Sequence, residues 1–501
     1  MINKFNSQSN KRKNPTNYRI KSYTNIGPRK KQTTHISTSI KTRSTYTPTN
    51  KNRLTITMIN HIIIIGFGSI AQGLLPLLSK HYNGATITIF EKSPQKTHFL
   101  IASEFLANLE SFPITSENFD RILSPHLNEN VFLINLAVTV SSLAIAKLTQ
   151  RHNSLYLDTC IEPWSYGTGG NKTLTTNYEL REEMKNCQRK NSGSTAILAH
   201  GANPGFISIL LKKALLEMAV LNNIAADPNH QVEWAALAKK LEIQVIQISE
   251  RDSQVPSTTR APFDFVSTWS ADGLITECLQ PAELGWGTHE GAPPLGAKKN
   301  GYAIEMCESG YQVRVKSWSP NYLEFSAYLL THNEALSISE YLTLGDPRAP
   351  TYRPTVFYAY EPCDQTLDSI MLLDKKSKNY DFEKIVLKNE ITSGADELGI
   401  FLISNKYNAF WLGSNLSIGK AKKIAHYNNA TSLQVVASII GGMKWAEKFP
   451  REGIVESESL DWKYIYDITA IYWEPIVKQE VNWRPSQTDG SLSFNNFISD
   501  K

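Results

Sequence analysis

Cysteine is scarce in this chain of 501 residues and never stands at the close spacing that holds a metal ion. Five cysteines are scattered along the sequence: Cys160, Cys187, Cys278, Cys307 and Cys363. No two of them form a Cys-x-x-Cys pair, and the odd count argues against a disulfide framework or a structural zinc site. We therefore expect no metal and a reduced, cytoplasmic setting.

Long apolar runs are also absent. The longest candidate extends only from Val435 to Met443, whereas a membrane-spanning helix needs roughly 18 apolar residues. Apolar residues make up 41% of the chain and charged residues 20%, which is the balance of a soluble globular protein. The sequence thus predicts no membrane partner, and its length suffices for two or three domains.

Acidic residues are missing from residues 1–57, which contain 13 Lys or Arg. This basic leader is rich in Asn, Thr and Ser and has few large apolar residues, so it is expected to be disordered. Three interpretations compete: an arm that binds polyanions, a transit peptide, or translated upstream sequence with the native start at Met58. The last is favoured because Met58 directly precedes the first predicted strand.

The basic leader hides the charge of the remaining chain. Subtracting its 13 basic residues from the total of 52 leaves 39, against 47 acidic residues, so residues 58–501 carry a formal charge of −8. A surface that binds phosphate backbones needs the opposite sign. We expect no nucleic-acid partner for this part of the chain.

Short β-branched segments alternate with helical spacing between residues 58 and 205. The run His61–Ile65 is continuous and apolar, as in a parallel strand that is buried on both faces. Further strands are predicted at residues 86–90, 131–136, 154–159 and 196–200, with helices at 74–81 and 141–152. This alternation predicts an α/β fold with a Rossmann-type, doubly wound parallel sheet.

The pattern changes after this region. A helix is predicted at residues 206–219, and short alternating segments between residues 245 and 360 favour an antiparallel sheet in a second, α+β domain. Helical spacing returns after about residue 396. We therefore divide the chain into residues 1–57, 58–205, 206–395 and 396–501, and expect the last part to be helical and to return to the first folded domain.

The strongest local motif is Gly66-x-Gly68-x-x-Ala71, which follows the first strand and opens a helix. Gly66 allows the tight turn, Gly68 lets the backbone approach a pyrophosphate, and Ala71 keeps helix and strand close. The free N–H groups of the helix N-terminus then face the anion. In this context the motif predicts a dinucleotide site, whereas the same glycines alone would indicate only a turn.

Glu91 ends the second predicted strand, 18 residues after Gly73. An acid at this position accepts hydrogen bonds from the adenosine ribose hydroxyls and repels a 2′-phosphate, so NAD is favoured over NADP. Lys92 and Lys96 lie nearby and weaken that preference. The alternative is that Glu91 is a solvated acid at a strand end.

Seven short motifs follow one another along the chain. They are Ile65–Ile70, Glu162–Trp164, Gly201–Gly205, Glu250–Asp252, Pro281–Glu290, Thr331–Ala335 and Tyr352–Thr355. Each alone is ambiguous, because Trp is more often a core residue than a site residue and Asn-Pro-Gly is more often a turn. Together, and in this order, they resemble the bacterial homospermidine synthases from Met58 to about Ile476.

This resemblance implies a saccharopine-dehydrogenase-like fold, a homodimer and an NAD-dependent reaction on putrescine. In the family, NAD oxidises putrescine to an imine, a second amine displaces ammonia, and the retained NADH reduces the new imine to sym-homospermidine. Residues 58–205 would then bind NAD, and residues 206–395 would bind substrate and form the dimer. The implied cofactor contacts are Gly66, Gly68, Ser69, Ile70, Ala71, Glu91, Asn135, Leu136, Ala137, Thr159 and Asn203.

The resemblance also implies an amine site that is rich in acids, as a dicationic substrate requires. The residues assigned to it are Glu162, Glu250, Glu277, His332, Glu334, Asn203 and Trp269. Trp269 matches the aromatic residue that stabilises a cationic intermediate through its π face. Clustered acids raise one another's pKa, so Glu162 or Glu250 is expected to transfer protons, and the sequence does not separate the two.

One position departs from the family pattern, since Thr139 stands where the family has Asp. If that Asp binds an amine, this chain has one negative charge fewer and its amine preference changes. Two alternatives stay open. A carboxynorspermidine or saccharopine-type dehydrogenase would need an Arg or Lys for its substrate's carboxylate, and a non-catalytic sensor would bind NAD and polyamine without turnover.

Overall fold

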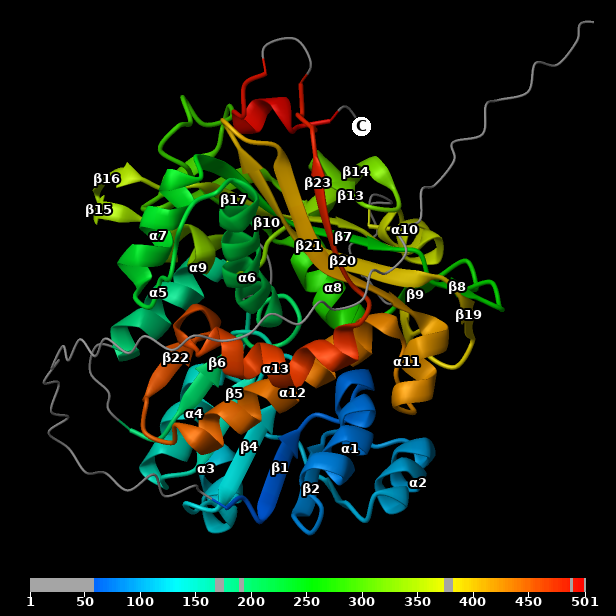
Figure 1. Ribbon diagram of the computed structural model, residues 1–501. Coiled ribbons are helices and arrows are strands. Elements are labelled where there is room, and N and C mark those ends of the chain that lie inside the picture. Colours follow the sequence, from blue (N-terminus) through cyan, green and yellow to red (C-terminus); the bar gives the residue numbers. More distant parts are fainter. Residues whose placement is uncertain (1–57, 167–174, 189–192, 374–381, 487–489, 500–501) are drawn as a thin grey trace, which may run out of the picture. The chain divides into compact units, whose positions relative to one another are not determined.

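The computed structural model describes residues 58–166, 175–188, 193–373, 382–486 and 490–499 (Figure 1). These residues belong to one compact unit. The basic leader lies outside the described residues, so its disorder and the start at Met58 stay predictions. No helix in the described ranges is long and apolar enough to cross a membrane.

Seven strands form the first sheet, in the spatial order β22-β6-β5-β4-β1-β2-β3. Their bounds are β1 His61–Ile65, β2 Thr86–Glu91, β3 Asn108–Ser111, β4 Val131–Asn135, β5 Leu155–Asp158, β6 Ala196–Leu198 and β22 Ile454–Glu456. All pairings are parallel, which confirms the predicted doubly wound sheet. The strand order reverses between β1 and β4, and ligands of open α/β sheets bind at such a switch point.

The helices in the same part of the chain are α1 Ser69–His81, α2 Lys96–Glu104, α3 Phe119–Leu123, α4 Ser142–Arg151 and α5 Asn177–Gln188. Side chains of β1 alternate across the sheet, so the strand contributes to two cores. Ile62 and Ile64 pack in the core that contains the leucines of α1, whereas Ile63 and Ile65 pack with Ile145 of α4. This double burial explains why β1 is apolar at four successive positions.

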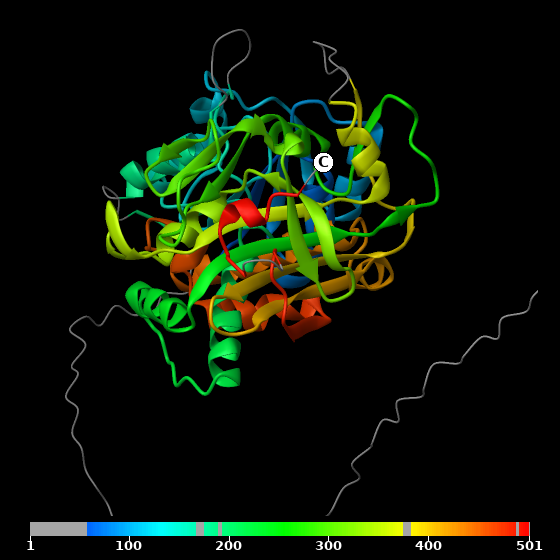
Figure 2. The ribbon, with the colours of Figure 1, turned by 90° about the horizontal axis from the view of Figure 1, so that it is seen from above.

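The second sheet has ten strands, and Figure 2 looks onto its green and gold strands, which come from distant stretches of the chain. Its path is β11-β12-β10-β17-β7-β20-β21-β23, and β14 pairs with both β13 and β17. The bounds are β7 Ile243–Asp252, β10 Pro281–Gly285, β11 Lys298–Asn300, β12 Ala303–Ser309, β13 Arg314–Ser319, β14 Leu323–Leu330, β17 Thr355–Glu361, β20 Ala395–Ser404, β21 Ala409–Ser417 and β23 Ile476–Val481. The smaller pairs are β8 Val255–Pro256 with β19 Ile391–Ser393, β9 Asp264–Ser267 with β18 Glu383–Val386, and β15 Leu344–Asp346 with β16 Ala349–Tyr352.

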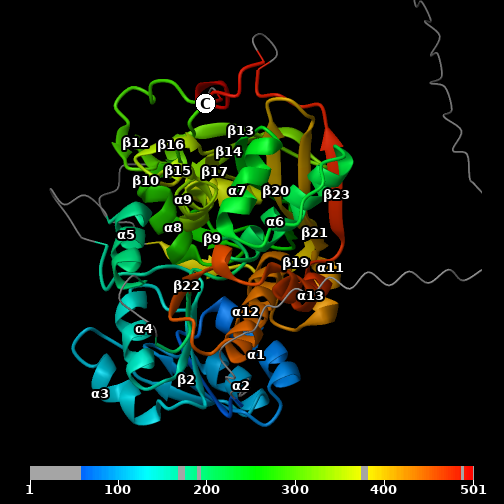
Figure 3. The ribbon, with the colours of Figure 1, turned by 60° about the vertical axis from the view of Figure 1, so that its left-hand side comes forward.

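Eight further helices accompany these strands: α6 Phe206–Leu221, α7 Gln231–Lys240, α8 Ala271–Leu279, α9 Asn333–Tyr341, α10 Asp364–Ile370, α11 Ile418–Ile424, α12 Ala430–Lys448 and α13 Trp462–Trp473. Helix α12 packs against α1 and α13 (Figures 1 and 3). Leu433 and Ile440 of α12 share one continuous apolar core with Ile64 of the first sheet and Ile248 of the second. Because a single core joins both sheets, the segments that line their common border are held firmly.

Two predictions for the second part of the chain need correction. The sheet is not purely antiparallel, because β17 pairs in parallel with β7, and the chain between them is long enough for the required crossover. The range 396–501 is not simply helical either, since β20, β21 and β23 pair within the second sheet. Strand β20 is buried along nearly its whole length, so it lacks the alternation by which a sequence reveals a strand. The domain boundaries themselves stay predictions.

Candidate functional site

A cavity lies at the carboxyl ends of β4 and β5, against β7, α8 and the segment before α9. It encloses about 1190 Å³ of empty space, counted with its opening to solvent. Eleven predicted site residues line it: Ile70, Asn135, Leu136, Ala137, Thr159, Glu162, Asn203, Glu250, Trp269, Glu277 and His332. Residues predicted from separate motifs thus lie around one space, at the switch point of the first sheet.

The glycine-rich turn between β1 and α1 has the geometry of an anion site. Gly66 has a φ of +89°, and a Cβ there would lie 3.0 Å from the backbone of Ala137, so this turn requires glycine. A Cβ on Gly68 would meet nothing within 4 Å, which leaves open space in front of its backbone. Helix α1 then begins without a side-chain cap or an acidic residue in its first turn. Its free N–H groups are therefore available to a phosphate.

Glu91 holds this turn from the end of β2. Its Oε2 accepts the backbone N–H of Phe67 at 2.8 Å, and its Oε1 accepts that of Ser93 at 3.0 Å. Each carboxylate oxygen has a further lone pair for a ribose hydroxyl, so the predicted ribose contact is geometrically open but stays a prediction. Ser69 and Ala71 have other partners, since the Ser69 hydroxyl donates to the carbonyl of Trp269 at 2.8 Å and Ala71 is buried in the core.

His332 lies between two buried carboxyl groups at the start of α9. Its Nε2 is 3.1 Å from Oε2 of Glu277, and its Nδ1 is 3.1 Å from Oε1 of Glu334. Burial opposes a charge on the ring, but the two glutamates outweigh burial and raise the pKa of His332 well above its ordinary value. Burial also raises the pKa of Glu277, and His332 offsets part of that rise. The ring is thus an imidazolium that donates on both sides.

Glu250 and Glu162 reach the cavity from strands of the two different sheets. Glu250, on β7, accepts the hydroxyl of Tyr358 at 2.6 Å and the side-chain amide of Asn203 at 3.1 Å. Glu162 follows β5 and accepts the backbone N–H of Thr139 at 3.0 Å. Burial is the main cause that raises the pKa of each carboxyl group to about 7. We refer to Glu162, Glu250, Glu277, His332 and Glu334 as the cavity cluster.

Trp269 is held at the N-terminus of α8. The side chain of Ser270 caps this helix by accepting the N–H of Gly273 at 3.0 Å. A Cβ on Gly273 would lie 2.7 Å from the indole ring of Trp269, so the glycine lets the ring lie against the helix. The indole therefore has a fixed position in the cavity wall.

Sequence reasoning missed several residues of this site. Tyr358 bonds Glu250, and its ring lies 4.1 Å from that of His332, but a Tyr within a buried strand looks like a core residue in the sequence. Asp252 and Asp396 face each other across β7 and β20 behind Glu250, and burial raises the pKa of both. Asp252 stands in one of the seven motifs, whereas nothing in the sequence marks Asp396.

Arginine and lysine side chains are missing from the described part of the cavity wall. None of the described lining residues is Arg or Lys. The described residues also contain no group of three or more His, Cys, Asp or Glu side chains arranged to hold a metal ion. An acid-rich wall with one imidazolium and one indole suits a ligand that carries its own positive charge.

Comparison with known proteins identifies relatives along most of the chain. Residues 62–197 match the saccharopine dehydrogenase NADP binding domain, and residues 201–479 match the saccharopine dehydrogenase C-terminal domain. The homospermidine synthase of Blastochloris viridis is 37% identical over 438 residues, which cover 85% of this chain and 92% of that protein. The homospermidine synthase of Mesorhizobium japonicum is 35% identical over 443 residues, which cover 85% and 91%. A crystal structure of the homospermidine synthase from Legionella pneumophila in complex with NAD has a TM-score of 0.82 and 38% identity, and covers 89% of this chain and 99% of that one.

Proposed function

This chain belongs to the homospermidine synthase family, and we propose that its cavity converts two molecules of putrescine into sym-homospermidine and ammonia. The observation that carries the proposal is the composition of the wall, where Glu162, Glu250 and Glu277 line the same cavity as Trp269. Carboxylates bind ammonium groups, and an aromatic face stabilises a cationic carbon–nitrogen centre. The open glycine turn beside this wall gives a dinucleotide and an amine adjoining sites.

NAD is the cofactor of this family member, and the described residues fit it. The open space at Gly68 and the uncapped start of α1 suit a pyrophosphate, while Glu91 suits the adenosine ribose and repels a 2′-phosphate. The wall around the rest of the cofactor would be formed by Ile70, Asn135, Leu136, Ala137, Thr159 and Asn203. When bound, NAD supplies the oxidation of a primary amine and the later reduction of an imine.

Putrescine is a dication, and the cavity cluster matches its two charged ends. Glu277 lies 3.1 Å from the imidazolium of His332, and this contact favours the carboxylate form that binds an ammonium group. The π face of Trp269 stabilises the cationic iminium carbon while the second amine attacks. Asn203 donates to Glu250 at 3.1 Å and thereby orients that carboxyl group.

Glu162 and Glu250 are suited to proton transfer because the pKa of each is about 7. A putrescine ammonium must lose a proton before its nitrogen reacts, and the departing ammonia must regain one. A carboxyl group that titrates near neutrality accepts the first proton and returns it at low cost in free energy. Both groups meet this requirement, and the choice between them stays open.

The two alternative functions are less well supported. A carboxynorspermidine or saccharopine-type dehydrogenase needs a cation for the substrate carboxylate, and no described lining residue is Arg or Lys. The only observation that favours a non-catalytic sensor is Thr139, which stands where the family has Asp. The backbone N–H of Thr139 still donates to Glu162, so this position supports the cavity cluster without an acidic side chain.

We also propose that the protein is a homodimer and that it acts in the cytoplasm. The resemblance supports the dimer, and the five cysteines, none of which forms a disulfide, support a reducing compartment. Light scattering coupled to size-exclusion chromatography measures the molar mass directly. A mass of one chain at working concentration would contradict the dimer.

The proposed reaction is tested by incubating the purified protein with putrescine and a sub-stoichiometric amount of NAD, followed by polyamine chromatography. We expect homospermidine and ammonia in equal amounts, with no net accumulation of NADH. Net NADH would indicate a simple amine dehydrogenase. Binding of NAD and putrescine without any product would indicate a sensor, and Thr139→Asp would then be assayed for restored turnover.

A further inference from the structure

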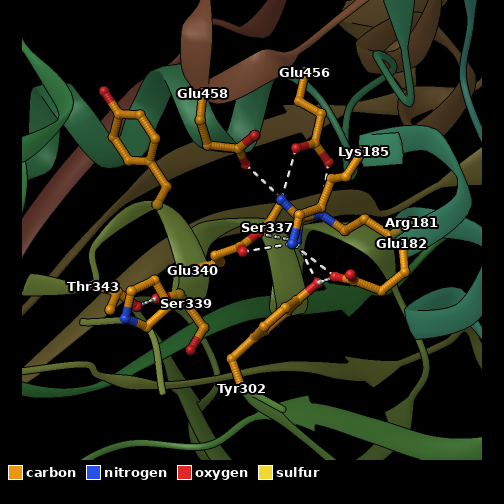
Figure 4. Close-up of polar contacts among 12 residues, drawn as sticks. Arg181, Glu182, Lys185, Tyr302, Ser337, Ser339, Glu340, Thr343, Glu456 and Glu458 are labelled. Atoms are coloured by element: carbon orange, nitrogen blue, oxygen red, sulfur yellow. Dashed lines mark hydrogen bonds and ion pairs between the residues drawn. The ribbon is translucent and has the colours of Figure 1, made fainter. Parts of the chain in front are cut away.

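Outside the cavity, one buried guanidinium joins four separate segments of the chain (Figure 4). Arg181, in α5, has a side chain that is only 4% exposed. Its Nε and Nη2 donate to the two oxygens of Glu456, each at 2.7 Å, at the end of β22. Its Nη1 donates to Glu340 of α9 and to the hydroxyl of Tyr302, each at 2.5 Å. Three segments are therefore fixed to α5 through one planar group.

A second cation completes this arrangement. Lys185, one turn further along α5, donates to Glu340 at 2.6 Å and to Glu182 at 2.7 Å. Burial opposes ionisation of Glu340, but Arg181 and Lys185 outweigh burial and lower the pKa of this carboxyl group. We call Arg181, Lys185, Tyr302, Glu340 and Glu456 the clamp cluster.

Both helices that the clamp cluster joins lead directly to the cavity. Helix α9 begins after His332 and carries Glu334 in its first turn, less than two turns before Glu340. Helix α5 begins at Asn177, which lines the cavity one turn before Arg181. The cavity cluster is thus connected to the clamp cluster through two short rigid elements.

The N-termini of the two helices are also bonded to each other. The backbone N–H of Asn177 donates to the buried Glu283 at 2.9 Å, and its side-chain amide donates to the hydroxyl of Thr331 at 3.0 Å. The same Thr331 hydroxyl donates to Glu283 at 2.7 Å, and His332 follows Thr331 in the chain. A shift of α5 against α9 would therefore be transmitted to the imidazolium of His332.

We infer that Arg181 is a positioning residue for the proposed reaction. By fixing α5 to α9, its guanidinium holds the start of α9, with His332 and Glu334, in its place against Glu277 of α8, and this arrangement sets the charge that binds the amine. The inference rests on the proposed function, because it concerns the geometry of that same site. A planar fork that bonds Glu456 at two points has no equivalent in lysine, whose single ammonium is a point charge.

The test compares Arg181→Lys with Arg151→Lys in the full chain. Arg151 forms an exposed ion pair with Asp120, with side chains 59% and 52% exposed, so its variant controls for loss of an Arg. For Arg181→Lys we expect kcat/KM for putrescine to fall about 10- to 100-fold, with a raised KM, a shifted pH profile and an unchanged Kd for NAD. Arg151→Lys should match the wild type in every measurement.

The outcomes separate positioning from simple loss of folded protein. A smaller active fraction lowers kcat but moves neither KM nor the pH profile, so that result would overturn the inference. Because Arg181→Lys could fold poorly, Glu340→Gln serves as a milder second variant that retains an oxygen acceptor, and a raised KM is expected again. If the wild type forms no homospermidine, the proposed function fails. If the wild type is active and both variants equal it, only the positioning role fails.

Discussion

The cavity cluster and the clamp cluster are both buried and charged, yet they are built in opposite ways. In the cavity cluster four carboxyl groups accompany one imidazole, and Oε2 of Glu334 is buried without a hydrogen-bond partner. In the clamp cluster every carboxylate oxygen of Glu340 and Glu456 accepts a bond from a cationic side chain. An excess of buried negative charge costs stability until a cationic ligand arrives, whereas a fully paired cluster is costly to break. This contrast supports the proposal that the cavity cluster binds the amine and that the clamp cluster holds the surrounding helices in place.

The largest effect is expected from removing the centre of the clamp cluster. Arg181→Met leaves the buried Glu456 without its cation and the half-buried Glu340 with Lys185 alone, so the free energy of unfolding should fall by about 3–5 kcal/mol. Urea unfolding of the apo-protein measures this change. Arg151→Met, which breaks an exposed ion pair, should cost less than about 1 kcal/mol. If both variants lost the same free energy of unfolding, the clamp cluster would stabilise the protein no more than an exposed ion pair does.

In the cavity cluster, we expect the removal of a charged group to raise the free energy of unfolding instead of lowering it. Burial holds the pKa of Glu162 at about 7, above its usual 4.5, so its ionisation weakens folding progressively between these two pH values. Glu162→Gln should therefore stabilise the apo-protein by about 2–3 kcal/mol at pH 8 and by nothing at pH 4. If Glu162 rather than Glu250 transfers the proton, turnover should also fall about 100-fold.

Unfolding curves at both pH values and steady-state assays check this second prediction. In the proposed reaction the carboxylate form of Glu162 binds the diamine, so kcat/KM of the wild type should rise as the pH passes through about 7. A variant that loses stability at pH 8 would contradict the claim that Glu162 is an unfavourable buried charge in the free protein.

A smaller effect is expected where the cavity uses an aromatic face instead of a charge. Trp269→Ala removes a desolvated cation–π contact worth about 2 kcal/mol, which corresponds to a roughly 30-fold loss in turnover. The Kd for NAD should stay the same, although the Trp269 carbonyl bonds Ser69, because that contact belongs to the backbone. Trp269→Phe should keep part of the activity. Full activity of the alanine variant would remove the indole from the mechanism.

The smallest effect is expected in the glycine-rich turn between β1 and α1, which belongs to neither charged cluster. A methyl group on Gly68 meets no protein atom within 4 Å, so Gly68→Ala should fold normally and intrude only on the cofactor. The Kd for NAD should rise roughly tenfold, because the backbone approaches the pyrophosphate there. Gly291→Ala, at another glycine with nothing within 4 Å, is the matched control. Equal NAD affinity in both variants would place the pyrophosphate elsewhere.

The sequence predicts the first sheet much better than the second. Strand β1 is recognisable because four apolar β-branched residues face two cores at once and a glycine turn follows. Strands β17 and β7 pair across a hundred residues of intervening chain, and no local pattern carries that information. The burial of β20 on both faces likewise removed the alternation that would have marked it as a strand.

The sequence likewise predicts one part of the candidate site and not another. Motifs predict which residues approach the cavity, because Glu162, Glu250 and His332 each stand in a short dense segment. They do not predict pairing, such as the contact of His332 with Glu277, which lies 55 residues away. The sequence did not predict Tyr358 as a site residue, because an aromatic residue in a buried strand is equally typical of the core. The sequence thus does not predict contacts between residues far apart in the chain, nor does it distinguish a site residue from a core residue in a buried strand.

The central claim is that the cavity oxidises one amine and reduces the resulting imine without releasing the reduced cofactor. The most direct measurement uses putrescine deuterated at both carbons next to nitrogen, in the presence of excess unlabelled NADH, with mass spectrometry of the product. Our account predicts homospermidine that keeps every deuterium of its two parent molecules, because the atom removed in the first step is returned in the last. Product that lacks one deuterium per molecule would show exchange with free NADH and would contradict the account.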